Sequence, residues 1–369
     1  MITRAEVEKL GAMHAVESAI LSLYLAVPSD PSELNGLADH AGELVAAAKA
    51  MAGASDCLRD EDRKAVMQKL AAGGRDWLGQ TVAIFASADA GLLEALPLPC
   101  RLPERAVLAT RPHIRPLLVA LQRCPAYRVA VVDQWLAWLF AIAADEIETV
   151  PEAAAAISGD GTTTWRRLGT HRAQQRIVQL AGHRYHHATA ILEQVMGPDE
   201  RQPLVVGGHD DGICQLLTEL PPTVREGFAG GFTADAATLT PAQVRDLAAP
   251  VIARWAEQRA RREADEIVAT PPGGLAAIGL PACLAAVNAG AVETLVVPDD
   301  GLVPGYECGR CGVLSTDADG CPDWGTAPLP VQDVVEEMVA RTLEDGGQTL
   351  VISDASAPMA ARLHFPLTR

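Results

Sequence analysis

The sequence predicts an α/β fold, on two observations. Short apolar runs typical of buried strands, such as residues 81–86 and 203–207, alternate with stretches whose apolar residues recur at helical spacing, such as residues 61–71. Glycine and proline pairs separate several of these segments. The chain has 369 residues, more than a single hydrophobic core usually organises. We therefore expect two or three domains that mix helices and strands.

The first part of the chain, residues 1–124, is expected to be an α/β domain. Its predicted strands are residues 19–27, 81–86, 92–98 and 106–110. Its predicted helices are residues 32–51, 61–71 and 113–121. Strands and helices are mixed along this part, which favours a sheet covered by helices.

The middle part, residues 125–270, is expected to hold a second sheet. Its predicted strands are residues 126–133, 135–142, 146–150 and 203–207, and its predicted helices are residues 213–220 and 240–267. Residues 135–142 are apolar on both faces, so we expect that strand to be central.

A polar turn, Gly207-Gly208-His209-Asp210-Asp211, follows the strand at residues 203–207. His209, Asp210 and Asp211 could form a metal or acid/base group. The same residue types are also common where a strand turns into a helix, because they cap the helix. The acidic side chains argue against a bound phosphate at this turn.

The last part, residues 271–369, is expected to be a compact α/β/α unit. Its predicted elements are a helix at residues 280–289, a strand at 293–297, a cysteine-bearing insertion, a helix at 331–343 and a strand at 349–353. Gly346-Gly347-Gln348 lies between the last helix and strand, where we expect the glycines to end the helix.

Residues 161–192 are unusual in charge. They contain five arginines, four histidines and no acid, in a chain whose formal net charge is -17. A loop rich in glycine and threonine precedes Thr170, which is a suitable N-cap for the helical spacing that follows. Arginine side chains match phosphate geometry, so an extended polyanion is a natural partner. An arginine-rich solvated face would have the same composition.

The overall composition limits the class of protein. The negative net charge argues against a protein that coats DNA or RNA nonspecifically, so any RNA contact must be local. The longest apolar run, residues 135–144, is about half the length that crosses a bilayer. Eight cysteines without a regular framework are typical of reduced thiols. We expect a cytoplasmic protein that binds neither membrane nor DNA.

The chain resembles the archaeal and eukaryotic class-I release factor and Pelota superfamily in three features. They are the order of its three parts, the basic loop that leads into a helix, and the stretch from Gly279 to Val297. The resemblance implies three domains, 1–124, 125–270 and 271–369, the last of the L7Ae type. Among bacterial members, the chain is most similar to the group that contains the hibernation factor Balon and mycobacterial relatives labelled peptidyl-tRNA hydrolases.

The resemblance implies binding in the A site of the 70S ribosome, with elongation factor Tu as a further partner. In that setting, arginines would neutralise phosphates of ribosomal RNA and aromatic side chains would stack on bases. The candidate RNA-binding residues are Trp165, Arg166, Arg167, Gly169, Thr170, His171, Arg172, Arg176, His183 and Arg184.

True release factors carry Gly-Gly-Gln in the middle-domain loop, where the glutamine helps water attack the ester of peptidyl-tRNA. This chain has Leu168-Gly169-Thr170 at the corresponding place. Gln174 and Gln175 are the substitutes for a catalytic glutamine if the helix begins later than predicted. The decoding motifs of eukaryotic release factors are not visible, so the sequence gives no support for stop-codon reading.

A group of cysteines in the last part looks like a zinc ribbon. Cys308 and Cys311 form a Cys-x-x-Cys pair, and Cys321 follows with Trp324 where a fourth cysteine is expected. Asp323 could supply the fourth ligand, or packing alone could hold the knuckle. The metal would be structural, and no other cofactor is expected.

Three hypotheses follow for function. The first is a noncatalytic factor of hibernation type that occupies the ribosomal A site. The second is a peptidyl-tRNA hydrolase that rescues ribosomes and uses Gln174 or Gln175 to position water. The third is a protein adaptor whose basic helix does not touch RNA. Charge reversal of Arg172 and Arg176 separates the third from the first two.

Overall fold

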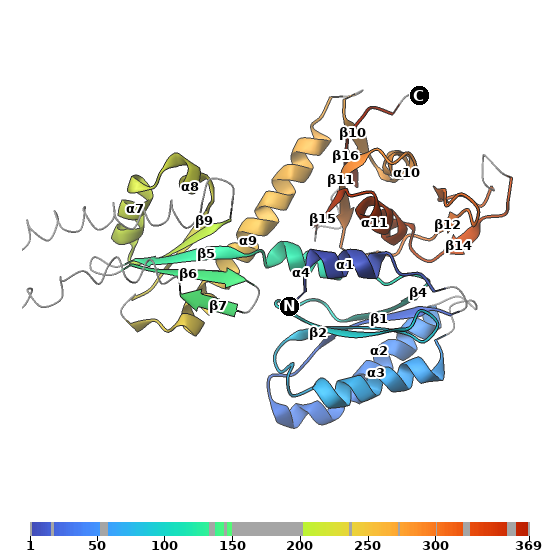
Figure 1. Ribbon diagram of the computed structural model, residues 1–369, viewed down its shortest axis with the longest axis horizontal. Coiled ribbons are helices and arrows are strands. Elements are labelled where there is room, and N and C mark those ends of the chain that lie inside the picture. The colour runs from blue at the N-terminus through green and yellow to red at the C-terminus, as the bar shows by residue number, and fades with distance from the viewer. Residues whose placement is uncertain are drawn as a thin grey trace, which may run out of the picture. The chain divides into compact units, whose positions relative to one another are not determined.

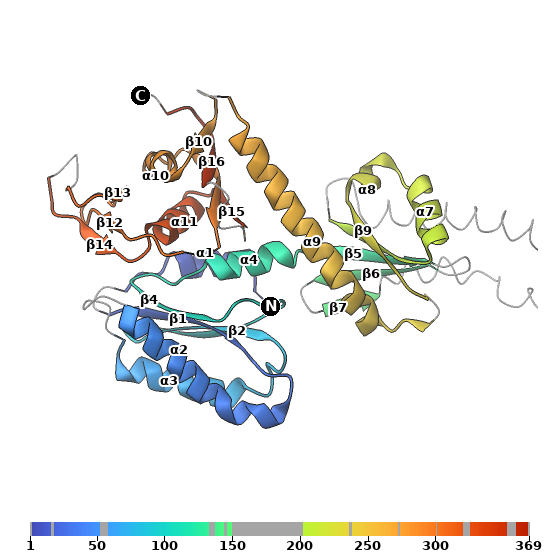
Figure 2. The ribbon, with the colours of Figure 1, turned by 180° about the vertical axis from the view of Figure 1, so that it is seen from behind.

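The computed structural model describes residues 2–15, 18–51, 58–132, 137–143, 146–149, 202–235, 238–271, 274–299, 301–319, 325–352 and 359–367. The chain divides into two compact units (Figures 1 and 2). Unit 1 joins residues 1–122 to residues 257–369, and unit 2 comprises residues 123–256. The α/β class is confirmed, whereas the three-domain division remains a prediction.

The first third of the chain contributes a four-stranded antiparallel sheet to unit 1. The strand order is β3 (Leu92–Leu98), β2 (Thr81–Ser87), β1 (Ile20–Ala26) and β4 (Arg105–Ala109). The helical segments of this part are α1 (Arg4–Gly11), η1 (Pro31–Gly36), α2 (Leu37–Met51), α3 (Asp60–Gly73) and α4 (Arg115–Arg123). Helices α2 and α3 cover one face of the sheet (Figure 1).

Strand β1 is mostly apolar, and both its faces are buried. Leu21, Leu23 and Leu25 belong to the core beneath α2 and α3. Ile20 and Tyr24 point the other way, since side chains alternate along a strand, and belong to a second core.

The last third of the chain contributes a second four-stranded sheet to unit 1. Its order is β10 (Ala276–Ile278), β16 (Ala360–Leu363), β11 (Val292–Pro298) and β15 (Gln348–Ile352). Helices α10 (Leu280–Asn288) and α11 (Val334–Glu344) pack with it, and β12 (Gly305–Glu307), β13 (Leu314–Ser315) and β14 (Leu329–Val331) form a small separate sheet. Among the described strands of the four-stranded sheet, β11 and β15 pair in parallel and the other neighbours are antiparallel.

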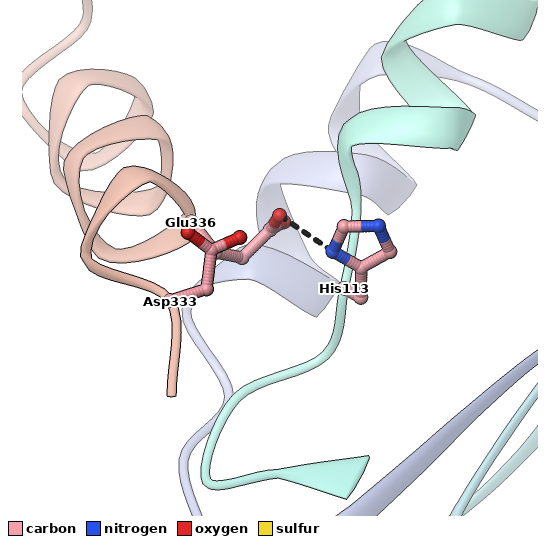
Figure 3. A group of neighbouring side chains, drawn as sticks. All are labelled: His113, Asp333 and Glu336. Atoms are coloured by element: carbon pink, nitrogen blue, oxygen red, sulfur yellow. Dashed lines mark ion pairs between the residues drawn. The ribbon is translucent and has the colours of Figure 1, made fainter. Parts of the chain in front are cut away.

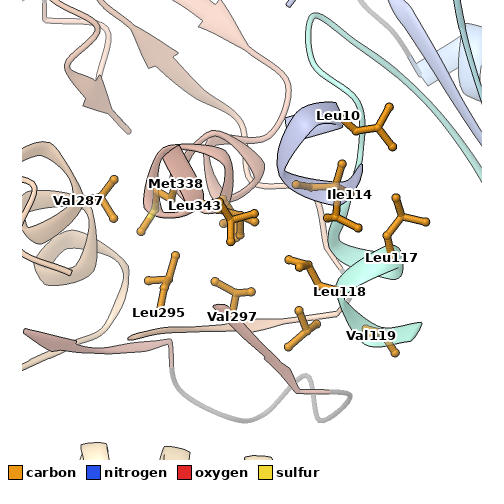
Figure 4. Close-up of a cluster of buried hydrophobic side chains, with 14 of the residues drawn as sticks. Leu10, Ile114, Leu117, Leu118, Val119, Val287, Leu295, Val297, Met338 and Leu343 are labelled. Atoms are coloured by element: carbon orange, nitrogen blue, oxygen red, sulfur yellow. The ribbon is translucent and has the colours of Figure 1, made fainter. Parts of the chain in front are cut away.

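One hydrophobic core joins the first and last thirds. Leu10 of α1, Ile114 before α4 and Leu117 of α4 belong to the same buried cluster as Leu295 of β11 and Met338 of α11 (Figure 4). All five side chains are at most 1% exposed. At roughly 1.5–3 kcal/mol for each fully buried large apolar side chain, this shared core is a major source of stability for unit 1.

Unit 2 contains a five-stranded sheet between helices. The strand order is β7 (Glu146–Thr149), β6 (Ala137–Ala143), β5 (Tyr127–Val132), β8 (Leu204–Gly208) and β9 (Phe228–Thr233). Its helices are α7 (Asp210–Glu219), α8 (Pro222–Glu226) and the start of α9 (Pro241–Val268). Alternate residues of β5 pack toward α7 and α8 on one face and toward α9 on the other.

The central strand of this sheet is β5, so the prediction that residues 135–142 are central was wrong. Strand β6 is buried as expected but lies second from the edge. The difference arises because β8 pairs with β5 in parallel. The apolar pattern of one strand does not show on which side a later strand will pair.

Among the helices of the described residues, none is both long enough and apolar enough to cross a membrane.

Candidate functional site

The basic segment on which the sequence analysis centred lies within residues 150–201, outside the described residues. This range holds the candidate RNA-binding residues Trp165, Arg166, Arg167, Gly169, Thr170, His171, Arg172, Arg176, His183 and Arg184, and both glutamines, Gln174 and Gln175. What the structure describes is the sheet on either side of the segment, which follows β7 and precedes β8.

The carboxyl ends of β5 and β8 meet at one edge of the unit 2 sheet, because these strands are parallel. Gly208 ends β8 with a φ of 144°, and a Cβ at this position would lie 2.0 Å from the Val132 carbonyl oxygen. Only glycine fits this approach of two backbones. The requirement explains one of the two glycines at this turn.

His209, Asp210 and Asp211 at the start of α7 are exposed and do not form a compact group. His209 makes no capping hydrogen bond through its side chain. Asp210 Oδ1 accepts a hydrogen bond from the Thr233 hydroxyl at 2.9 Å, which ties α7 to β9. In the described part of the chain, the single cluster with metal-ligand spacing contains none of these three residues. The turn therefore makes a hydrogen bond that stabilises the fold, but its three side chains are not arranged as metal ligands.

Cys308 and Cys311 lie on the tight turn between β12 and β13. The Cys308 amide donates to the Val313 carbonyl at 2.9 Å, and the Gly312 amide donates to the Cys308 carbonyl at 2.7 Å. The Cys308 sulfur is 3.3 Å from the Thr326 hydroxyl. This hydrogen bond, with others from the backbone amides of Cys311 and Arg310, lowers the pKa of the Cys308 thiol to about 6.

A thiol with this pKa is ionised at neutral pH, and a thiolate is the form of cysteine that binds metals. The turn is also firmly held. The Asn288 side chain exchanges two hydrogen bonds with the backbone of Leu314, at 2.8 and 2.9 Å. Arg341 of α11 donates to the Gly312 carbonyl. Cys321 and Asp323, the other candidate ligands, lie outside the described residues.

A buried charged cluster in unit 1, which the sequence analysis did not find, joins the first and last thirds. His113 lies just before α4, Asp333 is the N-cap of α11 and Glu336 lies in its first turn (Figure 3). Arg115, the first residue of α4, contacts both carboxylates. The Arg115 side chain is 1% exposed. A buried charge is tolerated only when it is fully paired and hydrogen-bonded, so its contacts account for its position.

The Arg115 guanidinium spans the cluster. Its Nε donates to Glu336 Oε2 at 3.0 Å, and Nη2 donates to Asp333. Nη1 and Nη2 also donate to the carbonyls of Pro298 and Gly301, each at 3.0 Å. Although burial opposes the charged form, the two carboxylates raise the pKa of Arg115 above its usual value.

The Glu336 carboxylate is contacted by several other groups of the cluster. His113 Nδ1 lies 2.8 Å from Glu336 Oε2, and the Ile114 amide donates to Oε1. Burial opposes ionisation of Glu336, but the nearby His113 and Arg115 and these hydrogen bonds outweigh it and bring its pKa down to about 2. Burial has the larger effect on Asp333, whose pKa is raised.

His113, Asp333 and Glu336 have the spacing of a metal site. However, Arg115 already contacts both carboxylates and supplies the positive charge that a metal would bring. A cation added here would compete with a guanidinium that is itself buried. The arrangement is that of an internal ion-pair network that fastens α4 to α11.

A second layer of charge flanks the cluster. Arg111 Nε lies 2.7 Å from Glu337 Oε2, and its Nη1 donates to Glu344 at 3.0 Å and to the Gly11 carbonyl at 2.9 Å. Glu337 is 5% exposed, and burial raises its pKa to about 7 in spite of Arg111. Helix α11 thus carries Glu336, which is ionised at neutral pH, and Glu337, which is partly protonated at neutral pH.

Comparison with known proteins gives one family match. Residues 112–261 match the model described as bacterial archaeo-eukaryotic release factor family 10. No curated protein matches the chain. The matched residues include all of unit 2, the insertion between the two parts of unit 1.

Solved structures give weak similarity over most of the chain. The archaeal translation termination factor aRF1 is 14% identical over 99% of each chain, with a TM-score of 0.26. Archaeoglobus fulgidus Pelota is 13% identical over 79% of this chain and 81% of that chain, with a TM-score of 0.38. Dom34 of S. cerevisiae is 10% identical over 82% of each chain, also with a TM-score of 0.38. The family match over residues 112–261 agrees with the resemblance to the release-factor and Pelota superfamily that the sequence predicts.

Proposed function

We propose that this protein is a ribosome-binding translation factor that occupies the A site of the 70S ribosome without hydrolysing peptidyl-tRNA. The observation that carries the proposal is the release-factor family match, which includes both strands that flank the basic segment. That segment concentrates arginine and histidine without acid in a chain of net charge -17, as a local contact with ribosomal RNA requires.

In this proposal, Arg166, Arg167, Arg172 and Arg176 neutralise phosphates, and Trp165 stacks on a base. A second group, Gly169, Thr170, His171, His183 and Arg184, completes the contact surface. Leu168-Gly169-Thr170 replaces Gly-Gly-Gln, and this replacement supports a factor that binds without esterase chemistry. A hibernation factor that works in the cytoplasm, with elongation factor Tu as a partner, is the specific form we favour.

The test is cosedimentation of the purified chain with vacant 70S ribosomes at increasing salt. Binding is expected to weaken with salt, because each phosphate contact releases counterions. R172E/R176E is expected to lose binding at least about tenfold, since two contacts become repulsive. The matched control is R261E/R262E, which reverses two adjacent exposed arginines on α9 and is expected to bind as the wild type does.

Two outcomes would contradict the proposal. Equal binding of R172E/R176E and the wild type would remove the basic segment from the contact and favour the adaptor hypothesis. Turnover of peptidyl-tRNA on stalled ribosomes, lost in Q174A or Q175A, would instead favour a peptidyl-tRNA hydrolase. That alternative has the family match in its favour as well, because release factors as a class include esterases.

We further propose that Cys308 and Cys311 hold a structural zinc ion, with Cys321 and Asp323 as the remaining ligands. The low pKa of Cys308 and its sulfur hydrogen bonds to backbone amides support this proposal, because such bonds stabilise a metal-bound thiolate. We expect about one zinc per chain by elemental analysis. C308S should lose it and C214S, at an exposed cysteine outside the motif, should keep it. A wild-type chain without stoichiometric metal would contradict the proposal.

A further inference from the structure

The contact between the first and last thirds of the chain buries several ionisable side chains. Replacing a buried ion-pair network by apolar residues is often neutral or stabilising. Here α11 presents Asp333, Glu336 and Glu337 to the first third, all at most 6% exposed. Glu336 is contacted by His113, Arg115 and the Ile114 amide, whereas Glu337 is held mainly by one ion pair, with Arg111.

Glu337 is faced by charged groups on every element around it. From its own helix come Glu336 and Arg341, and from β12 comes Glu307. From the first third comes Arg111, which Glu344 also contacts. His14, which follows α1, interacts electrostatically with both Arg111 and Glu307. Burial and the two neighbouring acids, Glu307 and Glu336, oppose the ionisation of Glu337 more strongly than Arg111 and Arg341 favour it.

We propose that Glu337 makes this contact a proton-sensitive clamp, which holds residues 2–122 against residues 274–367 more tightly in mildly acidic solution than above neutral pH. The clamp closes when Glu337 is neutral and loosens when Glu337 carries a charge in the buried contact. The proposal does not depend on the ribosomal function proposed above.

The direction follows from proton linkage. The pKa of Glu337 is about 7 in the closed contact and near its ordinary value of 4.5 when the contact opens and water reaches it. The closed form therefore binds the proton more tightly, so lowering the pH from 8 to 5.5 favours closure. The shift corresponds to a gain of roughly tenfold to thirtyfold in the closing equilibrium.

Two other groups modify this response. Burial raises the pKa of Asp333, which adds to the closing effect of acid. Burial and then Arg111 lower the pKa of His14, which works in the opposite direction as the pH falls through its ordinary value of 6.5. Glu336 has a pKa of about 2, below its ordinary value of 4.5, so its ionised form stabilises the closed contact until the pH falls below about 4.5.

The experiment is hydrogen–deuterium exchange of the full chain at pH 5.5 and pH 8, corrected for the intrinsic exchange rate. The peptide to follow covers residues 111–121, in which the Ile114 amide donates to Glu336. Wild-type protection of this peptide should be about tenfold higher at pH 5.5. E337Q, a neutral side chain of the same shape, should give the high protection at both pH values.

The matched control is E344Q. Glu344 is the other carboxylate on Arg111, but its side chain is 42% exposed, so its variant should keep the wild-type pH response. H14Q should enlarge the response because it removes the opposing group. The clamp is overturned if the wild type is protected equally at both pH values, if E337Q keeps the pH response, or if E337Q fails to fold.

Discussion

Arg115 is the side chain on which the ion-pair network of unit 1 depends. It is essentially buried, and it donates to two carboxylates and two backbone carbonyls. Removing one partner of a buried network leaves uncompensated charge, which costs about 3–5 kcal/mol. A substitution of Arg115 therefore destabilises the protein mainly through the two carboxylates that lose their partner.

The R115M variant should therefore lower the free energy of unfolding by about 3–5 kcal/mol, because Asp333 and Glu336 lose their cation. Urea unfolding followed by circular dichroism measures the loss. R101M, at an exposed arginine in the same third, is the control and should change it by less than about 0.5 kcal/mol. A similar small change in R115M would show that the network does not stabilise the contact.

The sequence contains a signal for this network. Glu336 and Glu337 lie within a run of apolar residues from Val334 to Val339, at positions that a buried helix face would occupy. Acids on such a face require partners. Their partners lie more than 200 positions earlier in the chain, so no local pattern could identify Arg115 or Arg111.

At the scale of single elements, strong local patterns were predicted well. The expected strand at residues 92–98 coincides with β3, and the expected strand at residues 81–86 is one residue shorter than β2. Strand β9 was missed because Gly230 and Gly231 lie in its centre, and glycine weakens a strand pattern. Helix α1 was missed because it is short and buries only one side.

The turn at the end of β8 gives a test at this scale. G208A places a Cβ 2.0 Å from the Val132 carbonyl oxygen and forces a φ that alanine avoids, so β5 and β8 must separate. Unfolding free energy should fall by about 2 kcal/mol or more. G42A, in α2 with nothing within 4 Å of its Cβ, should be neutral or stabilising. Equal effects of the two substitutions would refute the crowding at Gly208.

At the scale of the whole molecule, unit 1 is built from two segments that are remote in sequence. The predicted boundaries at residues 124 and 270 follow composition and glycine–proline breaks, which report where local structure stops. Composition and glycine–proline breaks do not show which segments, remote in sequence, pack into one hydrophobic core. Leu10 and Met338 illustrate this, because each is apolar at helical spacing but neither indicates its partner.

Gln122 tests whether unit 1 behaves as one cooperative unit. Its side-chain amide donates to the Val351 carbonyl at 3.0 Å and accepts from the Val351 amide at 3.1 Å, so it extends the edge of β15. Q122A should cost about 1–3 kcal/mol and should raise hydrogen exchange in residues 20–26 and 334–344 together. Exchange in residues 204–208 of unit 2 should not change. A response confined to residues 348–352 would show that the two thirds open independently.

The order of the chain also affects how the protein is made. Arg115 leaves the synthesising ribosome 221 residues before Glu336. At about 5–20 residues per second, that interval is roughly 10–45 s. During this time the apolar face formed by Ile20, Ile114 and Leu117 lacks its packing partners from the last third, and the sequence of unit 2 is completed within the same interval. Chaperones that shield apolar surfaces on nascent chains therefore have a defined window of action, which closes when α11 emerges.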